Sequence, residues 1–219
     1  MSEAREEYTR ENYPSFGKKY NSERAIISLT SWTARINTVS KTLYSLLTQC
    51  KGFHIVLVLS EEEFPKMMDE LPENLKLFVE NKLIEVLWVF RNYKAMKKVI
   101  FTMQKYPEVP IISADDDCVY DCNYAQELYD KWNKNKECLI RYKNFKNWHG
   151  LQGPCSLYFP HFYNLTKNYI SQIENFLTND DNFFRQIINN NDIKILSVTD
   201  KDPYHFHTKE GALNPEQYI

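Results

Sequence analysis

The sequence contains no apolar run that approaches the roughly 20 residues of a membrane-spanning helix. Its first residues, MSEAREEYTRENYP, are too polar and too acidic for a signal peptide. We therefore expect a cytoplasmic protein. Any contact with the inner face of the cell membrane would be peripheral, and the sequence does not locate it.

An excess of positive charge is also missing. The chain has 27 Lys and Arg against 29 Asp and Glu, which gives a formal net charge of -2. Nucleic-acid binding depends on a positive field, so we discount DNA and RNA as partners. The five cysteines lack the paired CxxC spacing of a zinc site, and we interpret them as reduced thiols without a chemical role. They are Cys50, Cys118, Cys122, Cys138 and Cys155.

The composition of the 219 residues favours a packed globular protein, because 43% are hydrophobic and 15% aromatic. The sequence has no internal repeat and no low-complexity segment. A chain of this length fits one domain and can bury roughly 70% of its unfolded surface.

Short apolar runs alternate with helical patterns in the first half of the chain. Because such alternation predicts parallel strands covered by helices, we expect an α/β protein with a mostly parallel central sheet. Ligands of such sheets bind beyond the carboxyl ends of the strands. The predicted strands of this half are 25–30, 53–60, 83–90 and 109–114.

The pattern changes near residue 121, where the second half of the same domain begins. This half mixes predicted helices at 123–136, 164–177 and 181–190 with predicted strands at 138–143, 151–162 and 193–198. Residues 1–22 form a polar arm before the domain, and residues 201–219 form a polar tail.

Three consecutive carboxylates, Asp115, Asp116 and Asp117, follow the fourth predicted strand. Like charges at this density repel one another unless a cation or hydrogen bonds offset them. On an extended backbone Asp115 and Asp117 face one pocket while Asp116 faces another, and Mg²⁺ or Mn²⁺ is typically held by one or two carboxylates together with substrate phosphates. The alternative is an acidic turn in which Asp116 or Asp117 caps the next helix; the strand before the cluster favours the cation site.

Several segments, in order, resemble landmarks of small bacterial GT-A glycosyltransferases related to family 2. They are IISLTSWTARINTVSKTLYSLLTQ, IVLVLSEEEFP, the Lys97-Lys98 helix that ends in YP, IISADDDCVY and TNDDNFF. The resemblance covers about residues 25–200. It implies a GT-A (Rossmann-like) fold over 23–200, with a nucleotide-sugar-binding half at 23–120 and an acceptor half at 121–200.

The resemblance also implies a nucleotide-diphosphosugar donor and an Asp-x-Asp metal motif on Asp115 and Asp117. The first Asp of that motif contacts the ribose or sugar and the last one the metal, so Asp117, with Asp115, is the expected Mn²⁺ or Mg²⁺ ligand. We place Asp115 and Asp116 on the donor side as well. The acceptor would be a glycan or glycolipid, and the usual setting of the family is polysaccharide or lipopolysaccharide synthesis.

Thr30, Ser31 and Arg35 lie in the first predicted strand-to-helix loop, where the family binds the nucleobase and ribose. Their hydroxyls and guanidinium suit uracil or phosphate contacts; helix capping by Ser31 or Thr33 is the alternative. The family also tends to place a donor-binding lysine after the third strand. We assign that role to Lys97, against the alternative of a solvated helix charge.

The acidic pair Asp180-Asp181 in TNDDNFF matches the position of the catalytic base of the family. An inverting transfer needs a carboxylate that removes the proton of the acceptor hydroxyl. Asp181 matches the second member of the pair, although the choice between the two stays open. The pair could instead favour the dipole at the start of the helix that follows. Asn179 departs from the small residue that usually precedes the pair.

The tail contains His205 and His207. GT-A enzymes often take a further metal ligand from the tail, and alternation makes both residues eligible; the alternative is that neither has a chemical role. Trp148-His149-Gly150 and Tyr158 are expected to line the acceptor side by their position alone. We thus predict an inverting hexosyltransferase. The alternatives are a metal-dependent phosphohydrolase, for which DDDCVY offers Val119 at the fifth position, and a non-catalytic module that binds a nucleotide-sugar or glycan.

Overall fold

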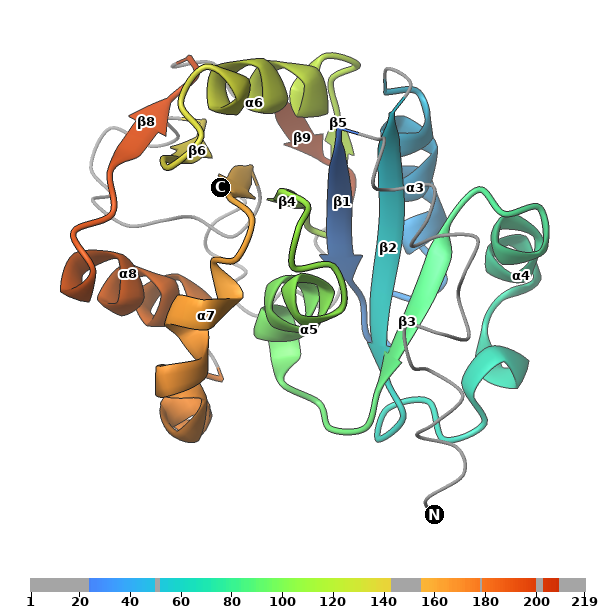
Figure 1. Ribbon diagram of the computed structural model, residues 1–219. Coiled ribbons are helices and arrows are strands. Elements are labelled where there is room, and N and C mark those ends of the chain that lie inside the picture. Colours follow the sequence, from blue (N-terminus) through green and yellow to red (C-terminus); the bar gives the residue numbers. More distant parts are fainter. Residues whose placement is uncertain (1–23, 50–51, 143–154, 178, 200–202, 209–219) are drawn as a thin grey trace.

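The computed structural model describes most of the predicted domain (Figure 1). The described residues are 24–49, 52–142, 155–177, 179–199 and 203–208. Trp148, His149 and Gly150 lie outside them.

The described residues form a central seven-stranded sheet with the order β3-β2-β1-β4-β7-β6-β8. The first four strands of the chain are parallel to one another, β7 is antiparallel to both β4 and β6, and β8 is parallel to β6. The expected mostly parallel α/β sheet is therefore confirmed. The strands are β1 (Ala25–Thr30), β2 (Phe53–Ser60), β3 (Glu85–Val89), β4 (Ile111–Ser113), β6 (Leu139–Arg141), β7 (Ser156–Tyr158) and β8 (Ile195–Ser197).

Helices cover both faces of the sheet, with α5 in front of it and α3 behind it in the view of Figure 1. Short 3-10 segments precede α4 and α5, and a longer one follows α7. The helical elements are α3 (Val39–Leu47), η2 (Met67–Glu70), α4 (Glu73–Glu80), η3 (Lys94–Met96), α5 (Lys97–Lys105), α6 (Tyr124–Asn133), α7 (Tyr163–Thr166), η4 (Lys167–Phe176) and α8 (Asp180–Asn190).

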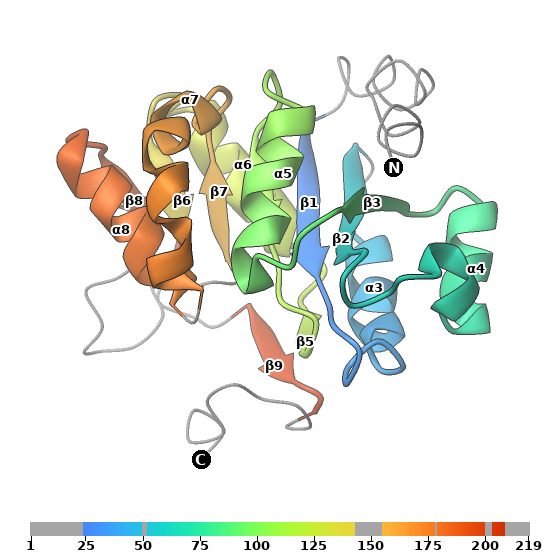
Figure 2. The same ribbon diagram turned by 90° about the horizontal axis from the view of Figure 1, so that it is seen from below.

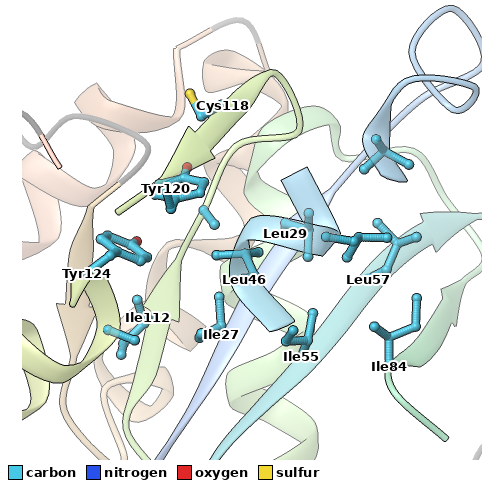
Figure 3. Close-up of a cluster of buried hydrophobic side chains, with 14 of the residues drawn as sticks. Ile27, Leu29, Leu46, Ile55, Leu57, Ile84, Ile112, Cys118, Tyr120 and Tyr124 are labelled. Atoms are coloured by element: carbon cyan, nitrogen blue, oxygen red, sulfur yellow. The ribbon is translucent and has the colours of Figure 1, made fainter. Parts of the chain in front are cut away.

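Alternation along β1 divides the core into two layers. Ile27 and Leu29 pack with side chains of α3, α4 and α6, and Figure 3 shows them beside Leu46 of α3. Ile26 points the other way and packs with side chains of α5, η4 and α8. Each face of β1 is thus fully covered, which is why this strand is a nearly continuous apolar run.

The parallel strands β1 and β4 end at the same edge of the sheet, because Ser28 is opposite Ser113 in their register. Ser31 therefore follows β1 at the edge where the aspartate cluster 115–117 follows β4. Helix α5 begins at this edge as well, since it is the helix that follows β3 and leads to β4. The fold thus gathers segments far apart in the sequence around one end of the strands.

A second, two-stranded sheet lies next to the aspartate cluster. It pairs β5 (Cys118–Tyr120) with β9 (Tyr204–Phe206) in antiparallel fashion (Figure 2). The sequence pattern predicts neither strand. Both have only three residues, and β9 lies within the segment predicted to be a polar tail.

None of the helices in the described part of the chain has the length and the apolar character needed to span a lipid bilayer.

Candidate functional site

Asp116 connects the loop after β4 to the loop after β1. Ser31 Oγ donates to Asp116 Oδ2 over 2.6 Å, and Arg35 Nη1 donates to Asp116 Oδ1 over 2.8 Å. Its side chain is buried, and burial raises the pKa of this carboxyl despite the opposing effects of Arg35 and Ser31. Since both carboxylate oxygens accept hydrogen bonds from the protein, Asp116 fixes the site geometry.

Asp117 shares the same guanidinium. Arg35 Nη1 lies 2.9 Å from Asp117 Oδ2, and Cys118 Sγ lies 3.4 Å from Asp117 Oδ1. The side chain of Asp117 is only 5% exposed. Simple alternation along the strand predicted that Asp115 and Asp117 face one pocket and Asp116 another. The structure differs, because the chain turns after β4 and the common partner Arg35 draws Asp116 and Asp117 together.

Asp115 is the most exposed of the three aspartates, with 30% of its side chain accessible. Lys98 Nζ forms an ion pair with its Oδ1, and its backbone N–H donates to the Tyr120 hydroxyl over 2.7 Å. Burial of the carboxyl, together with the charges of Asp117 and Asp180, raises its pKa above the ordinary range although Lys98 opposes this. Asp115 is therefore the carboxylate of the cluster that a ligand can reach most directly.

The two adjacent lysines of α5 have different partners, although both are buried. Lys97 Nζ donates to Glu63 Oε2 over 3.0 Å and to Asn92 Oδ1 over 3.1 Å. Burial lowers the pKa of Lys97 despite the charge of Glu63. Lys98 forms the ion pair with the aspartate cluster, whereas Lys97, the predicted donor-binding lysine, does so with Glu63. Because Lys97 and Lys98 are equally buried, the helical pattern cannot show which of the two lysines contacts the aspartate cluster.

The second acidic pair stands in the first turn of α8. Asn179 caps this helix by accepting a hydrogen bond from the Asn182 N–H over 3.0 Å. Asp180 and Asp181 therefore have the favourable dipole position that was the alternative to catalysis. The two roles are compatible, because a helix start also fixes the direction of its side chains.

The two acidic groups belong to one electrostatic site. Burial first, and then the charges of Asp180 and Asp115, raise the pKa of Asp181 to about 8, while Lys98 opposes the shift. Burial opposes the charge on Lys98, but Asp115, Asp180 and Asp181 outweigh it and raise the lysine pKa. Raised carboxyl pKa values of this kind are common where carboxyls act as acids or bases.

Tyr158 lies on β7 beside the same site. It is buried, and burial and then the charges of Asp180, Asp181 and Asp115 raise the pKa of its hydroxyl well above the ordinary value. Its ring packs against Phe162 and Phe184. The predicted acceptor-side residue is therefore in the electrostatic field of both acidic groups.

Thr30 is the predicted donor residue with the clearest structural role. Its Oγ1 donates to the Val58 carbonyl over 2.7 Å, which links the ends of β1 and β2. Neither Ser31 nor Thr33 caps the next helix, since the residue at the N-cap of α3 is Thr38. The capping alternative for Ser31 is thus replaced by its bond to Asp116.

The two histidines differ in their surroundings. His205 lies in β9 and is exposed, while His207 is half-buried and its backbone N–H donates to the Asp117 carbonyl over 2.9 Å. His207 Nε2 lies 3.1 Å from Thr42 Oγ1, and its buried Nδ1 has no hydrogen-bond partner among the described residues. Burial and the charge of Lys41 lower the pKa of His207, which favours the neutral imidazole that metals bind.

Within the described residues no three or more His, Cys, Asp and Glu side chains form a ready-made metal cluster. Mg²⁺ and Mn²⁺ do not require one, because they are often held by one or two carboxylates and by substrate phosphates. Asp115 and Asp117 offer carboxylate oxygens in the loop before β5, and His207, whose Nδ1 has no hydrogen-bond partner among the described residues, follows β9 and is bonded to the Asp117 carbonyl through its backbone. The residues therefore fit a cation that is bound together with a phosphorylated ligand.

No protein-family model and no curated protein sequence matches this chain. Solved structures do match. S. aureus TarS superposes with a TM-score of 0.56 at 14% identity, over 85% of this chain and 37% of the TarS chain. The likeness shows a GT-A-like fold.

TarS residues 1–349 match both in a complex with UDP and in a complex with UDP-GlcNAc. The UDP complex gives a TM-score of 0.54 at 15% identity, over 83% of this chain and 59% of the other. The UDP-GlcNAc complex gives 0.54 at 14% identity, over 87% and 60%. This chain thus spans between 37% and 60% of the length of the TarS chains.

Proposed function

We propose that this protein is a glycosyltransferase that moves a sugar from a nucleotide-diphosphosugar to an acceptor hydroxyl. The observation that carries the proposal is that the buried ammonium of Lys98 binds Asp115 and also lies in the electrostatic field of the pair Asp180-Asp181. The TarS fold supports it, because TarS forms complexes with UDP and UDP-GlcNAc. A uridine diphosphosugar is therefore the first donor to test.

The charge balance supports a divalent cation in the complete site. The two acidic motifs contribute five carboxyl groups, which are opposed by Arg35, Lys98 and Arg185, and a diphosphate would add further negative charge. Asp117 and Asp115 would hold Mn²⁺ or Mg²⁺, with His207 Nδ1 as a further candidate ligand. When bound, the ion would stabilise the charge of the departing nucleotide diphosphate.

The protein groups would then divide the remaining work. Ser31 and Arg35 hold Asp116, and this contact keeps the loops after β1 and β4 in register. Asp181 would accept the proton of the acceptor hydroxyl. The hydroxyl oxygen would attack the anomeric carbon from the side opposite the leaving diphosphate. This direct displacement would invert the anomeric configuration, and a base with a pKa near the working pH suits it.

The acceptor would lie near Tyr158 and the start of α8, on the side of the site away from Thr30. A hexose as the transferred sugar, a glycan or glycolipid acceptor, and a place in surface polysaccharide or lipopolysaccharide synthesis complete the proposal. These finer features depend on the family resemblance of the sequence.

A thermal-shift panel of nucleoside diphosphates with and without Mn²⁺ tests the donor site. We expect one nucleotide to stabilise the protein much more in the presence of Mn²⁺ than in its absence. A panel of nucleotide-sugars and acceptor glycans then tests turnover, with released nucleoside diphosphate as the readout. Release of inorganic phosphate without acceptor would indicate a phosphohydrolase instead, and binding without turnover across the panels would indicate a binding module.

A further inference from the structure

Lys98 is held in place through its backbone. Its carbonyl accepts a hydrogen bond from Ser28 Oγ of β1 over 2.5 Å, and Ser28 Oγ lies 2.7 Å from Thr102 Oγ1. These three residues are buried, so the first turn of α5 is fixed against β1. The backbone of Lys98 is therefore anchored to β1, and its side chain extends from this fixed position.

The ammonium of Lys98 faces carboxylates from two different segments. Asp115 binds it directly, and Asp180 and Asp181 at the start of α8 add to the negative field around it. Arg185 acts on Asp181 from the same helix. Asp180 and Asp181 thus offer the ammonium of Lys98 a second source of negative charge besides Asp115.

A divalent cation at Asp115 would compete with this lysine. Both need the same carboxylate, and two positive charges at a partly buried site repel each other strongly. The lysine would lose its partner unless it turned to Asp180 and Asp181.

We propose that Lys98 is an internal competitor of the divalent cation, which neutralises Asp115 while the donor site is empty and turns to Asp180 and Asp181 when the cation arrives. This inference rests on the proposed glycosyltransferase function and adds its regulation. The free site then binds the cation weakly. The negative charge of a donor diphosphate favours the cation over Lys98 at Asp115. Cation and donor therefore load together.

The test measures Mn²⁺ affinity directly, by calorimetry on the full chain without nucleotide. The titrations are run at pH 8.5, above the raised pKa values of Asp115 (about 6) and Asp181 (about 8) in the wild type. Lys98→Met keeps the length of the buried stem but removes the charge, and we expect Mn²⁺ to bind about tenfold more tightly or better. Lys98→Gln repeats the test with a polar neutral side chain, and Lys98→Arg should return the affinity toward the wild-type value.

Lys97→Met is the matched control. It removes an equally buried ammonium from the neighbouring position of the same helix, but that ammonium binds Glu63 and Asn92. Its Mn²⁺ affinity should stay within about twofold of the wild type. Thermal unfolding of each variant confirms that the fold is kept.

A second arm repeats the titrations with UDP as the probe. Binding of two ligands is reciprocally coupled, so UDP should tighten Mn²⁺ binding in the wild type by a factor that shrinks in Lys98→Met. Unchanged or weaker Mn²⁺ binding in both neutral variants overturns the proposal, as does equal tightening in Lys97→Met.

The two proposals fail in different ways. If Mn²⁺ binds and responds to Lys98 but UDP has no effect, the competition stands and the uridine donor is wrong. If Mn²⁺ binds to no variant, with or without UDP, both the competition and the metal-dependent reaction are wrong.

Discussion

Ser31 and Asp116 are 85 residues apart in the sequence, yet Ser31 Oγ donates to Asp116 Oδ2 over 2.6 Å in the interior of the protein. The bond joins the loop after β1 to the loop after β4. Arg35 adds a second link to the same carboxylate from the segment that leads into α3. The candidate site is therefore built on a buried polar connection, and its geometry and the stability of the fold depend on the same residues.

Asp116→Asn should lower the free energy of unfolding by about 2 kcal/mol, because a buried hydrogen bond to a charged group is lost. The amide keeps the shape of the side chain but cannot accept from both Ser31 and Arg35 as the carboxylate does. Urea unfolding at pH 7 measures the change. Asp130→Asn is the control, since Asp130 is exposed and its loss should cost less than about 0.5 kcal/mol. Equal stability of the two variants would show that the Asp116 contacts are unimportant.

The pH profile of transfer should identify the base. An ionised Asp181 is required to accept a proton, and its pKa is raised to about 8, so kcat/KM should increase as the pH rises toward and past that value. Asp181→Asn should reduce kcat by about 10² to 10⁴-fold and leave nucleotide binding intact.

Asp180→Asn separates the two members of the pair. It removes a neighbouring negative charge, so the pKa of Asp181 should fall and the rising limb of the profile should move to lower pH. Loss of activity at every pH in this variant, with an active Asp181→Asn enzyme, would instead assign the base to Asp180.

The sequence predicted the central sheet well because its strands are buried on both faces. The apolar runs at 25–30 and 53–60 coincide with β1 and β2. Parallel strands that are buried on both faces have such nearly continuous apolar sequences. The short strands β5 and β9 were missed, since three residues give no measurable period and their pairing is set by the aspartate loop between distant segments.

The sequence shows the acidic motifs of the candidate site but not the contacts that these motifs make. The acidic clusters 115–117 and 180–181 stand out by charge density, whereas the choice of Arg35 and Lys98 as their partners depends on how four segments meet. Lys97 and Lys98 are neighbours with equal burial, and only the three-dimensional position of Glu63 and Asn92 separates them. Propensity and periodicity contain no information on such long-range pairing.

A buried charge network at the opposite end of the strands should make stability depend on acid. Glu85 accepts from His54 Nε2 over 3.0 Å and from Tyr106 OH over 2.6 Å, and Lys105 Nζ lies 2.6 Å from its other oxygen. Burial alone would raise the pKa of Glu85, but His54 and Lys105 outweigh it and the pKa lies below its usual value. The resulting stabilisation is complete above the unfolded pKa of about 4.3 and is lost as the pH falls below it.

Glu85→Gln should therefore lower the free energy of unfolding at pH 7 by about 3 kcal/mol, because the buried carboxylate charge that Lys105 faces is removed. The difference from wild type should shrink as the pH falls below the unfolded pKa of about 4.3 toward the lowered pKa of folded Glu85, where the carboxylate gains its proton. Thermal unfolding between pH 3.5 and 7 measures both effects. Glu73→Gln, at an exposed position of α4, is the control that should follow the wild-type curve. A constant difference at all pH values would contradict the role of ionised Glu85.

His205 and His207 are both predicted metal ligands, and substitution can distinguish between them. His207 is half-buried beside Asp117, and within the described part of the chain its Nδ1 has no hydrogen-bond partner, while His205 is exposed on β9. A ligand contributes to affinity only if its nitrogen can reach the ion, so His207→Ala should weaken Mn²⁺ binding by about tenfold or more and His205→Ala should not.

The His207 substitution also removes the contact with Thr42 Oγ1, which a metal role does not require. His207→Asn keeps a polar side chain near Thr42 but supplies a poorer ligand, so it should retain the thermal stability of wild type and still bind Mn²⁺ weakly. Calorimetric titration with UDP present gives the affinities. If Mn²⁺ affinity falls only in His205→Ala, the histidine ligand is His205 on β9. If all three variants bind Mn²⁺ normally, neither histidine is a ligand and the cation is held by Asp115, Asp117 and the diphosphate.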